Sequence, residues 1–170
     1  MNDGPDRRKE RTRRAILGAF NELIIEGDLD DIRVSDIVQR ANVGRSTFYE
    51  HFSNADDLFM QAFSYPLSIL ADGLTGRGDE SALESILLHL WENRARGRRT
   101  FRGRTRERIT HLLLSLLRQR HGEQWDGHRL RALSEAVIGL VRAWLNGEMD
   151  ASVPEMTQAM ASCAYRLLAD

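Results

Sequence analysis

The chain of 170 residues contains a single cysteine, Cys163. One cysteine excludes an intramolecular disulfide and any zinc site built on several thiolates. The longest apolar run, at residues 112–117 with Ser115 inside it, is far shorter than the roughly 20 residues that a membrane-spanning helix needs. The first residues are polar and rich in arginine, unlike a signal peptide. We therefore expect a soluble, reduced, cytoplasmic protein with no membrane partner.

Lysine is also nearly absent, since Lys9 is the only lysine among 24 basic residues. The formal net charge of −1 excludes a uniformly basic nucleic-acid binder. Two segments are strongly basic in spite of this nearly neutral net charge. Residues 7–14 carry six basic side chains and one acidic, and residues 94–108 carry eight arginines and Glu107. Such blocks are typical of a polyanion-binding surface or of a solvated surface, and the first block could neutralise phosphates along DNA.

The chain also lacks any segment that alternates polar and apolar residues with a period of two, so no β-strand is predicted. Apolar residues instead recur at helical spacing, and hydrophobic residues make up 42% of the chain. We predict an all-α protein of about nine helices. We expect a kink at Pro66 and a short or broken helix in the arginine-rich segment. The other helices are expected at about 8–26, 34–41, 45–52, 55–70, 80–91, 106–120, 127–146 and 154–168.

The most informative segment covers residues 34–52, where two short predicted helices are separated only by residues 42–44. This spacing is typical of a helix-turn-helix, whose second helix enters the major groove of DNA. In that second helix Phe48 and Phe52 can pack inward, which leaves the polar side chains facing outward. The predicted DNA-binding residues are Arg33, Gly44, Arg45, Ser46, Thr47, Tyr49 and His51.

The residue types on the outward face suit contacts with a duplex. Arg45 can form a bidentate pair with guanine, and the hydroxyl groups of Ser46 and Thr47 can reach bases or phosphates. Tyr49 and His51 can donate hydrogen bonds to phosphate oxygens, which fix the register of the protein without reading the sequence.

The stretch VSDIVQRANVGRSTFYEHFSNADDLF, residues 34–59, resembles the DNA-binding signature of the tetracycline-repressor-like (TetR) transcriptional regulators. The likeness extends over residues 8–63, and the rest of the chain is similar only in its helical pattern. The matching positions are Ile37, Ala41, Val43, Thr47, Tyr49, His51, Phe52 and Leu58. The chain departs from the family pattern at Arg33, Asn42 and Ala55, where threonine, glycine and lysine are usual. We expect these departures to affect operator affinity and geometry more than the fold.

The resemblance implies a homodimer that binds a palindromic double-stranded DNA operator. It implies a helix-turn-helix DNA-binding domain at residues 1–53 and a helical effector-binding and dimerisation domain at residues 54–170. A small-molecule effector of unknown identity would bind the second domain and release the protein from DNA. The implied function is a ligand-responsive transcriptional regulator that acts as a repressor.

Most candidate residues in the second domain are apolar or aromatic, and each of these could equally be ordinary core. His89 and His111 could instead be polar anchors for a ligand, or simply partnered or exposed side chains. For the dimer interface, which the family forms with its last two helices, they are Leu133, Val137, Leu140, Val141, Trp144, Met156 and Met160. For the effector pocket they are Phe63, Tyr65, Leu87, His89, Trp91, Phe101 and His111, together with Ile109, Leu113 and Trp125.

No catalytic motif stands out, and we expect neither an enzyme nor a cofactor. His121, Glu123 and His128 are the only cluster that suggests a metal site, but their spacing matches no recognised ligand motif, so no metal is predicted. An alternative function is a helical protein-interaction module that uses its basic segments without specific DNA binding. The arginine-rich segment 94–108 could bind an anionic effector, contact flanking DNA, or simply be solvated.

Overall fold

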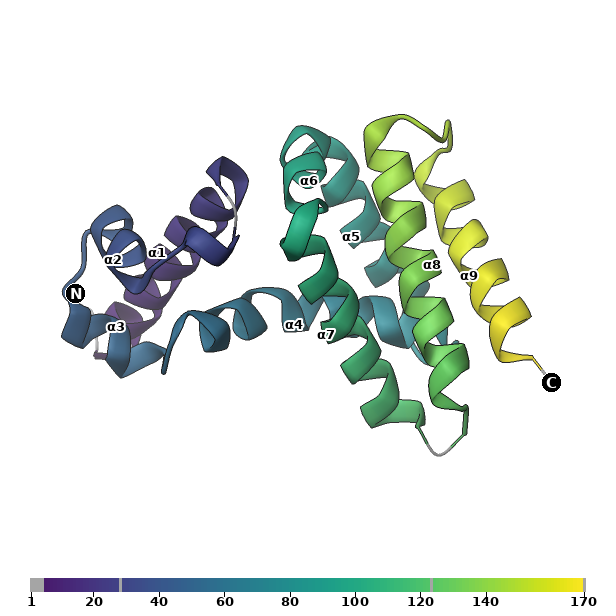
Figure 1. Ribbon diagram of the computed structural model, residues 1–170, viewed down its shortest axis with the longest axis horizontal. Coiled ribbons are helices and arrows are strands. Elements are labelled where there is room, and N and C mark those ends of the chain that lie inside the picture. Colours follow the sequence, from purple (N-terminus) through teal and green to yellow (C-terminus); the bar gives the residue numbers. More distant parts are fainter. Residues whose placement is uncertain (1–4, 28, 123, 170) are drawn as a thin grey trace. The chain divides into compact units, whose positions relative to one another are not determined.

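The computed structural model describes residues 5–27, 29–122 and 124–169 (Figure 1). Within these ranges the chain forms nine α-helices and one 3₁₀ turn, without a strand, which confirms the predicted all-α class. The chain divides into two compact units, Met1–Ala62 and Phe63–Asp170. The sequence places the domain boundary between residues 53 and 54, just before helix α4, whereas the units in the structure meet inside that helix.

The first unit holds three complete helices and the first part of a fourth. Its elements are α1 (Pro5–Glu26), the 3₁₀ turn η1 (Leu29–Asp31), α2 (Val34–Ala41), α3 (Arg45–His51) and the start of α4 (Ala55–Leu74). α2 packs against both α1 and α3. One apolar face of α1 is buried and forms the centre of this unit together with apolar residues from the rest of it: Ile16, Phe20, Ile24, Ile37, Phe48, Phe52, Leu58 and Phe59.

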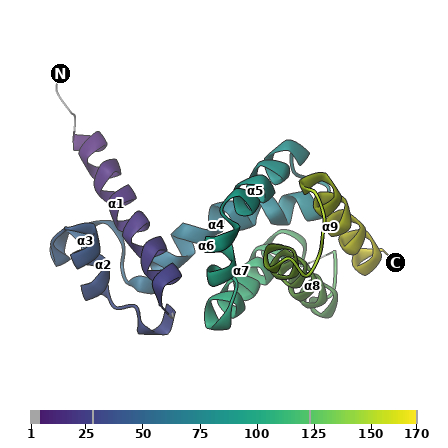
Figure 2. The ribbon, with the colours of Figure 1, turned by 90° about the horizontal axis from the view of Figure 1, so that it is seen from above.

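The second unit continues α4 and adds five helices. These are α5 (Glu80–Glu92), α6 (Arg94–Thr100), α7 (Gly103–His121), α8 (Gly127–Asn146) and α9 (Val153–Leu168). α8 packs against α6, α7 and α9, and α5 packs against α6 and α9 (Figures 1 and 2). α8 is therefore the central helix of the unit. Its inward face is almost fully buried and consists of Leu130, Leu133, Val137, Ile138, Val141, Trp144 and Leu145.

The helix ends follow from capping residues in the sequence. The Asp126 carboxylate accepts hydrogen bonds from the backbone N–H groups of His128 and Arg129, at 2.7 and 2.9 Å, and so begins α8. α8 ends at Gly147, whose φ of 77° is a left-handed conformation that favours glycine. Ser152 and Glu155 bond each other's backbone N–H groups at the start of α9. Short polar loops therefore set the lengths of the last two helices.

The arginine-rich segment contains the predicted short helix, α6, followed by a break at Phe101 and Arg102 before α7. Gly97 of α6 is buried against α8, and a Cβ atom added there would lie 2.9 Å from Leu145 Cδ1. The missing side chain lets the two helices approach closely. By contrast, α4 runs as one helix through Pro66, the site of the expected kink.

Two tryptophans join α5 to α8. The rings of Trp91 and Trp144 stack with their centroids 4.8 Å apart and an interplanar angle of 17°. The indole N–H of Trp144 donates a 2.7 Å hydrogen bond to the carbonyl oxygen of Ala151, in the loop before α9. Trp144 is fully buried, so it holds α5, α8 and that loop together inside one chain. Of the helices in the described ranges, none combines the length and hydropathy that crossing a membrane would require.

Candidate nucleic-acid interface

The turn between α2 and α3 is closed by Asn42, which adopts a left-handed backbone conformation with φ 52° and ψ 49°. The N–H of Asn42 donates to the carbonyl of Gln39, and the N–H of Val43 donates to the carbonyl of Val38. Asparagine tolerates this conformation better than most residues because its short polar side chain can form hydrogen bonds to nearby backbone groups. Asn42 thus replaces the usual glycine while keeping the tight turn.

α3 is fixed to the first unit by two phenylalanines on its inner face. Phe48 and Phe52 are at most 1% exposed, and their ring centroids lie 5.7 Å apart. The guanidinium group of Arg13 on α1 lies over the Phe52 ring, 5.8 Å from its centroid. Phe48 within the seven-residue helix and Phe52 directly after it are both buried, which leaves α3 little freedom to rotate about its axis.

The opposite face of α3 is polar and open to solvent. Arg45 and Ser46 are exposed, and Tyr49 is 57% exposed with its ring edge against Phe48. Thr47 and His51 are half-buried, at the sides of the helix. The structure therefore places five of the predicted contacts together on one short helix.

Gly44 and Arg33, the other two predicted contacts, are also exposed. Gly44 precedes α3 with an ordinary φ of −74°, so its backbone conformation does not require glycine. Arg33 precedes α2 and makes no side-chain capping bond. Its backbone N–H instead donates to the Asp36 carboxylate at 2.9 Å. This bond compensates for the missing threonine cap and leaves the Arg33 side chain in solvent.

A hydrogen-bonded chain ties α1 to the start of α4. Arg13 donates to Gln61 at 2.8 Å, and Gln61 donates to the Asp57 carboxylate at 3.0 Å. The backbone N–H of Ser53 also donates to Asp57, at 2.8 Å, and these hydrogen bonds lower the pKa of Asp57. Asn54 caps α4 by accepting from the Asp57 N–H. These bonds keep the polypeptide after α3 in place.

The end of α2 is tied to α1 by an exposed ion pair. Arg40 donates to both carboxylate oxygens of Glu26, at 2.6 and 2.9 Å, and to Glu22 at 3.2 Å. The hydrogen bond from Arg40 lowers the pKa of Glu26. Within the basic segment 7–14, Arg14 pairs with Glu10, whereas residues 7–9 are exposed cations near the start of α1.

A short helix with a buried aromatic face and an exposed Arg-Ser-Tyr face, held behind a tight turn, defines a helix-turn-helix DNA-binding domain. Residues 16–62 match the family model described as "Bacterial regulatory proteins, tetR family". Residues 16–62 thus resemble the DNA-binding region of TetR-like transcriptional regulators, in agreement with the resemblance seen in the sequence.

Curated proteins resemble this chain over part of its length. An uncharacterised helix-turn-helix regulator of Bacillus subtilis, YxbF, is 37% identical over 71 residues, which are 41% of this chain and 19% of that protein. The dhaKLM operon transcriptional activator DhaS of Lactococcus lactis is 32% identical over 83 residues, 48% of this chain and 44% of DhaS. The chain thus spans less than half the length of these curated relatives.

The fold of the whole chain has counterparts among solved structures. A TetR transcriptional regulator from Streptococcus agalactiae 2603V superposes with a TM-score of 0.58 and 24% identity, covering 94% of this chain and 96% of that one. The likeness extends over both units, so the helical second unit has the fold expected for this class of regulator.

The structure corrects part of the predicted effector pocket. Tyr65 is 74% exposed, and His89 and His111 are exposed as well, so these three side chains face solvent rather than an interior cavity. Each lies on the outward side of its helix, where a polar group keeps its hydration. The other candidates divide into half-buried Phe63, Trp91 and Trp125 and buried Leu87, Phe101, Ile109 and Leu113.

The predicted dimer residues need a larger correction. Of the seven predicted residues, Leu140 alone is partly accessible. The other six are inaccessible because they turn inward and fill the core of their own chain. A side chain that is fully buried in one chain is not available to a second. The six buried candidates are Leu133, Val137, Val141, Trp144, Met156 and Met160.

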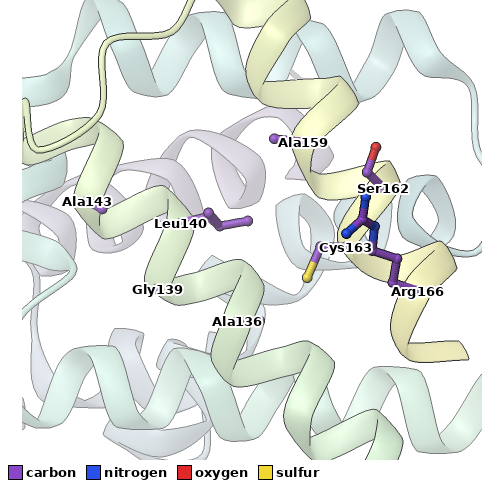
Figure 3. Close-up of a pocket in the computed structure, with 8 residues that line it drawn as sticks. All are labelled: Ala136, Gly139, Leu140, Ala143, Ala159, Ser162, Cys163 and Arg166. Carbon is purple, nitrogen blue, oxygen red and sulfur yellow. The ribbon is translucent and has the colours of Figure 1, made fainter.

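Around Leu140 the outer faces of α8 and α9 form a shallow apolar groove of about 560 Å³ (Figure 3). Most of its lining residues are small, whereas the interface predicted from the sequence contains only large apolar side chains. The helical spacing of the small residues on α8 was nevertheless visible. The lining consists of Ala136, Gly139, Leu140, Ala143, Ala159, Ser162, Cys163 and Arg166. Burial raises the pKa of the Cys163 thiol, which favours its protonated form.

The suggested metal cluster does not assemble in the described residues. His121 is only 3% exposed, whereas His128 is exposed, and Glu123 lies outside the described residues. Neither ring nitrogen of His121 has a hydrogen-bond partner among the described residues, and its ring lies 5.1 Å from that of Trp125. His121 is therefore a buried polar group without compensation inside the second unit.

We expect this histidine to make the second unit sensitive to mild acid. Burial first, and then the charges of Arg77 and Arg120, lower the pKa of His121, while Asp72, which pairs with Arg120, opposes them. The folded chain favours the neutral ring, so the free energy of unfolding should be highest above the unfolded pKa of about 6.5 and fall as pH drops below it. Urea unfolding at pH 7.5 and 5.5 measures this loss. The variant His121→Leu should lose markedly less stability over that interval, and an equal loss would contradict the assignment.

Proposed function

We propose that the protein is a ligand-responsive regulator that binds a palindromic operator as a homodimer. The observation that carries this proposal is the outward face of α3, where Arg45, Ser46 and Tyr49 stand exposed on a helix anchored by Phe48 and Phe52. A seven-residue helix of this kind fits the major groove, which is about 12 Å wide. We do not propose catalysis, because a TetR-like regulator acts by binding DNA. The proposed location of the protein is the bacterial cytoplasm.

Each exposed residue has a role that follows from its chemistry. Arg45 presents five N–H donors in a planar fork and pairs with the O6 and N7 atoms of guanine. The Ser46 and Tyr49 hydroxyl groups bond phosphates or bases beside it. Exposed Gly44 lets the DNA backbone approach the start of α3 closely, and Arg33 adds a phosphate contact at the start of α2.

A second copy of the chain is the partner proposed for the groove on α8 and α9. Small side chains at Ala136, Gly139 and Ala143 let two helix pairs approach each other, and Leu140 supplies an apolar contact at the centre. Two recognition helices on one particle then read two half-sites, which raises affinity through effective concentration.

Gly139→Glu provides a test of this dimer. A Cβ atom at Gly139 meets nothing within 4 Å in the single chain, and glutamate favours a helix over glycine, so the fold should be kept. We expect sedimentation to show a dimer for the wild type and a monomer for the variant. Gly18→Glu is the matched control, because Gly18 also lies within a helix with open space around it, and it should remain dimeric. A dimeric Gly139→Glu would place the interface elsewhere.

We propose that the effector enters the interior of the second unit, where the ring nitrogens of buried His121 offer unused hydrogen-bonding capacity. Its binding would favour a conformation in which the two recognition helices no longer match the half-site spacing. Repression is the simplest outcome of operator binding, since a bound dimer blocks access to the promoter. Activation is the alternative, and the regulator DhaS, which resembles about half of this chain, is described as an activator.

Selection of bound duplexes from a random DNA pool tests the proposal directly. We expect a palindromic site with half-sites about one helical turn apart, whose binding weakens steeply with salt. A helical protein-interaction module would give no enriched sequence. Absence of enrichment at low salt would overturn the proposal, and an asymmetric site would overturn its dimeric form.

A further inference from the structure

The arginine-rich segment separates into side chains with different surroundings. The Arg94 guanidinium lies 5.1 Å from the centre of the Trp91 ring, and Arg98 Nε donates a 2.6 Å hydrogen bond to the carbonyl oxygen of Leu145. These two arginines therefore help to hold α6 on α5 and α8.

Arg96, Arg99 and Arg102 have no such role, and we name them the α6 arginine patch. Arg96 and Arg99 lie one turn apart on α6, and Arg102 follows shortly after its end. All three are exposed, and none forms an ion pair with a carboxylate of the described residues. A cluster of three cations without countercharge creates a local positive potential that attracts anions.

The patch is carried by a well-fixed element. Gly97, one residue after Arg96, is buried against Leu145, and Phe101 is buried beside it. With the Arg98 hydrogen bond, these contacts anchor α6 on the central helix α8. Binding at the patch therefore orders only the arginine side chains and not the helix that bears them.

The chemistry and the exposure of the α6 arginine patch indicate which kind of anion it binds. Guanidinium groups pair bidentately with phosphate, which favours a phosphate-bearing ligand. A small effector is normally enclosed in a concave pocket, whereas these side chains stand out from an exposed helix. An extended ligand with regularly spaced phosphates can instead reach all three.

We propose that the α6 arginine patch binds the phosphate backbone of duplex DNA, as a contact separate from α3. This inference rests on the proposed function and extends it. α3 supplies sequence recognition, while the patch adds affinity that does not depend on sequence, for DNA beside the operator.

The test compares the full-length wild type with the triple variant Arg96→Gln, Arg99→Gln, Arg102→Gln. Two duplexes carry the operator recovered by selection, one ending at the operator and one with about one further helical turn on each side. The logarithm of the DNA-binding constant falls linearly with the logarithm of the salt concentration, and each lost phosphate contact makes this salt slope about 0.9 less steep. Three lost contacts per chain are six per dimer and lower the slope by about 5.4, which makes the affinity of the variant about 2,000-fold less sensitive to a rise from 50 to 200 mM salt.

The control variant Arg118→Gln, Arg131→Gln, Arg142→Gln removes the same charge from α7 and α8 and should keep the wild-type slope. If the variant of the α6 arginine patch has a reduced salt slope on the long duplex alone, the patch contacts flanking DNA. If its salt slope is reduced on both duplexes, the patch contacts DNA within the operator. An unchanged slope on both overturns the inference while the operator-binding function stands. Failure of the wild type to bind either duplex at low salt overturns both.

Discussion

Arg45→Ala is expected to abolish specific operator binding while the protein folds normally. A bidentate arginine–guanine pair contributes about 1–3 kcal/mol, and a dimer makes two, so operator affinity should fall by a factor between about 30 and 2 × 10⁴. The Arg45 side chain is exposed and contributes nothing to the core, so the melting temperature should not change. Fluorescence anisotropy with the selected operator and a scrambled duplex measures the loss.

Two companion variants sharpen this result. Tyr49→Phe should weaken binding to the operator and to the scrambled duplex alike, because a hydroxyl bond to phosphate carries no sequence information. Arg131→Ala removes an exposed arginine of α8 and should bind like the wild type. Retention of the same preferred site by Arg45→Ala would show that another residue reads the bases.

Trp144→Ala is expected to destabilise the chain itself by about 3–5 kcal/mol, the usual cost of removing a large buried aromatic side chain. The substitution removes the stack on Trp91 and the hydrogen bond to Ala151, and leaves a cavity between α5 and α8. Trp144→Phe can keep much of the stack but leaves the Ala151 carbonyl without its donor, so we expect a smaller loss.

Urea unfolding in the Gly139→Glu background distinguishes this role from a dimer contact. That background is expected to be monomeric, so a residue acting only between chains would cost nothing there. Because Trp144 is fully buried within one chain, we expect the full loss to persist. A loss that appears only in the dimer would contradict the assignment of Trp144 to the core.

The sequence predicts the first unit closely because its signals are local. Asn42 marks the turn, Asn54 marks the start of α4, and the two phenylalanines mark the inner face of α3. Each depends on residues within a few positions along the chain, so one sequence is enough to predict the helix-turn-helix and its exposed face.

The second unit is harder to predict because burial there depends on partners distant in the sequence. A stripe of large apolar residues, such as Val137 and Val141, shows that one face of α8 is covered but does not show by what. The structure shows that α8 uses its large residues inside its own chain and leaves small ones such as Gly139 outside. Tyr65 fails as a pocket residue for a related reason, because an aromatic side chain is not necessarily buried.

The contact at Gly97 couples two parts of the second unit mechanically. With no side chain between the backbone of α6 and Leu145, and with Arg98 bonded to the Leu145 carbonyl, α6 cannot slide along α8 without a clash or a broken bond. A molecule that displaces α6 without breaking these contacts would move α8 with it, and the outer face of α8 carries the groove proposed for the second copy of the chain.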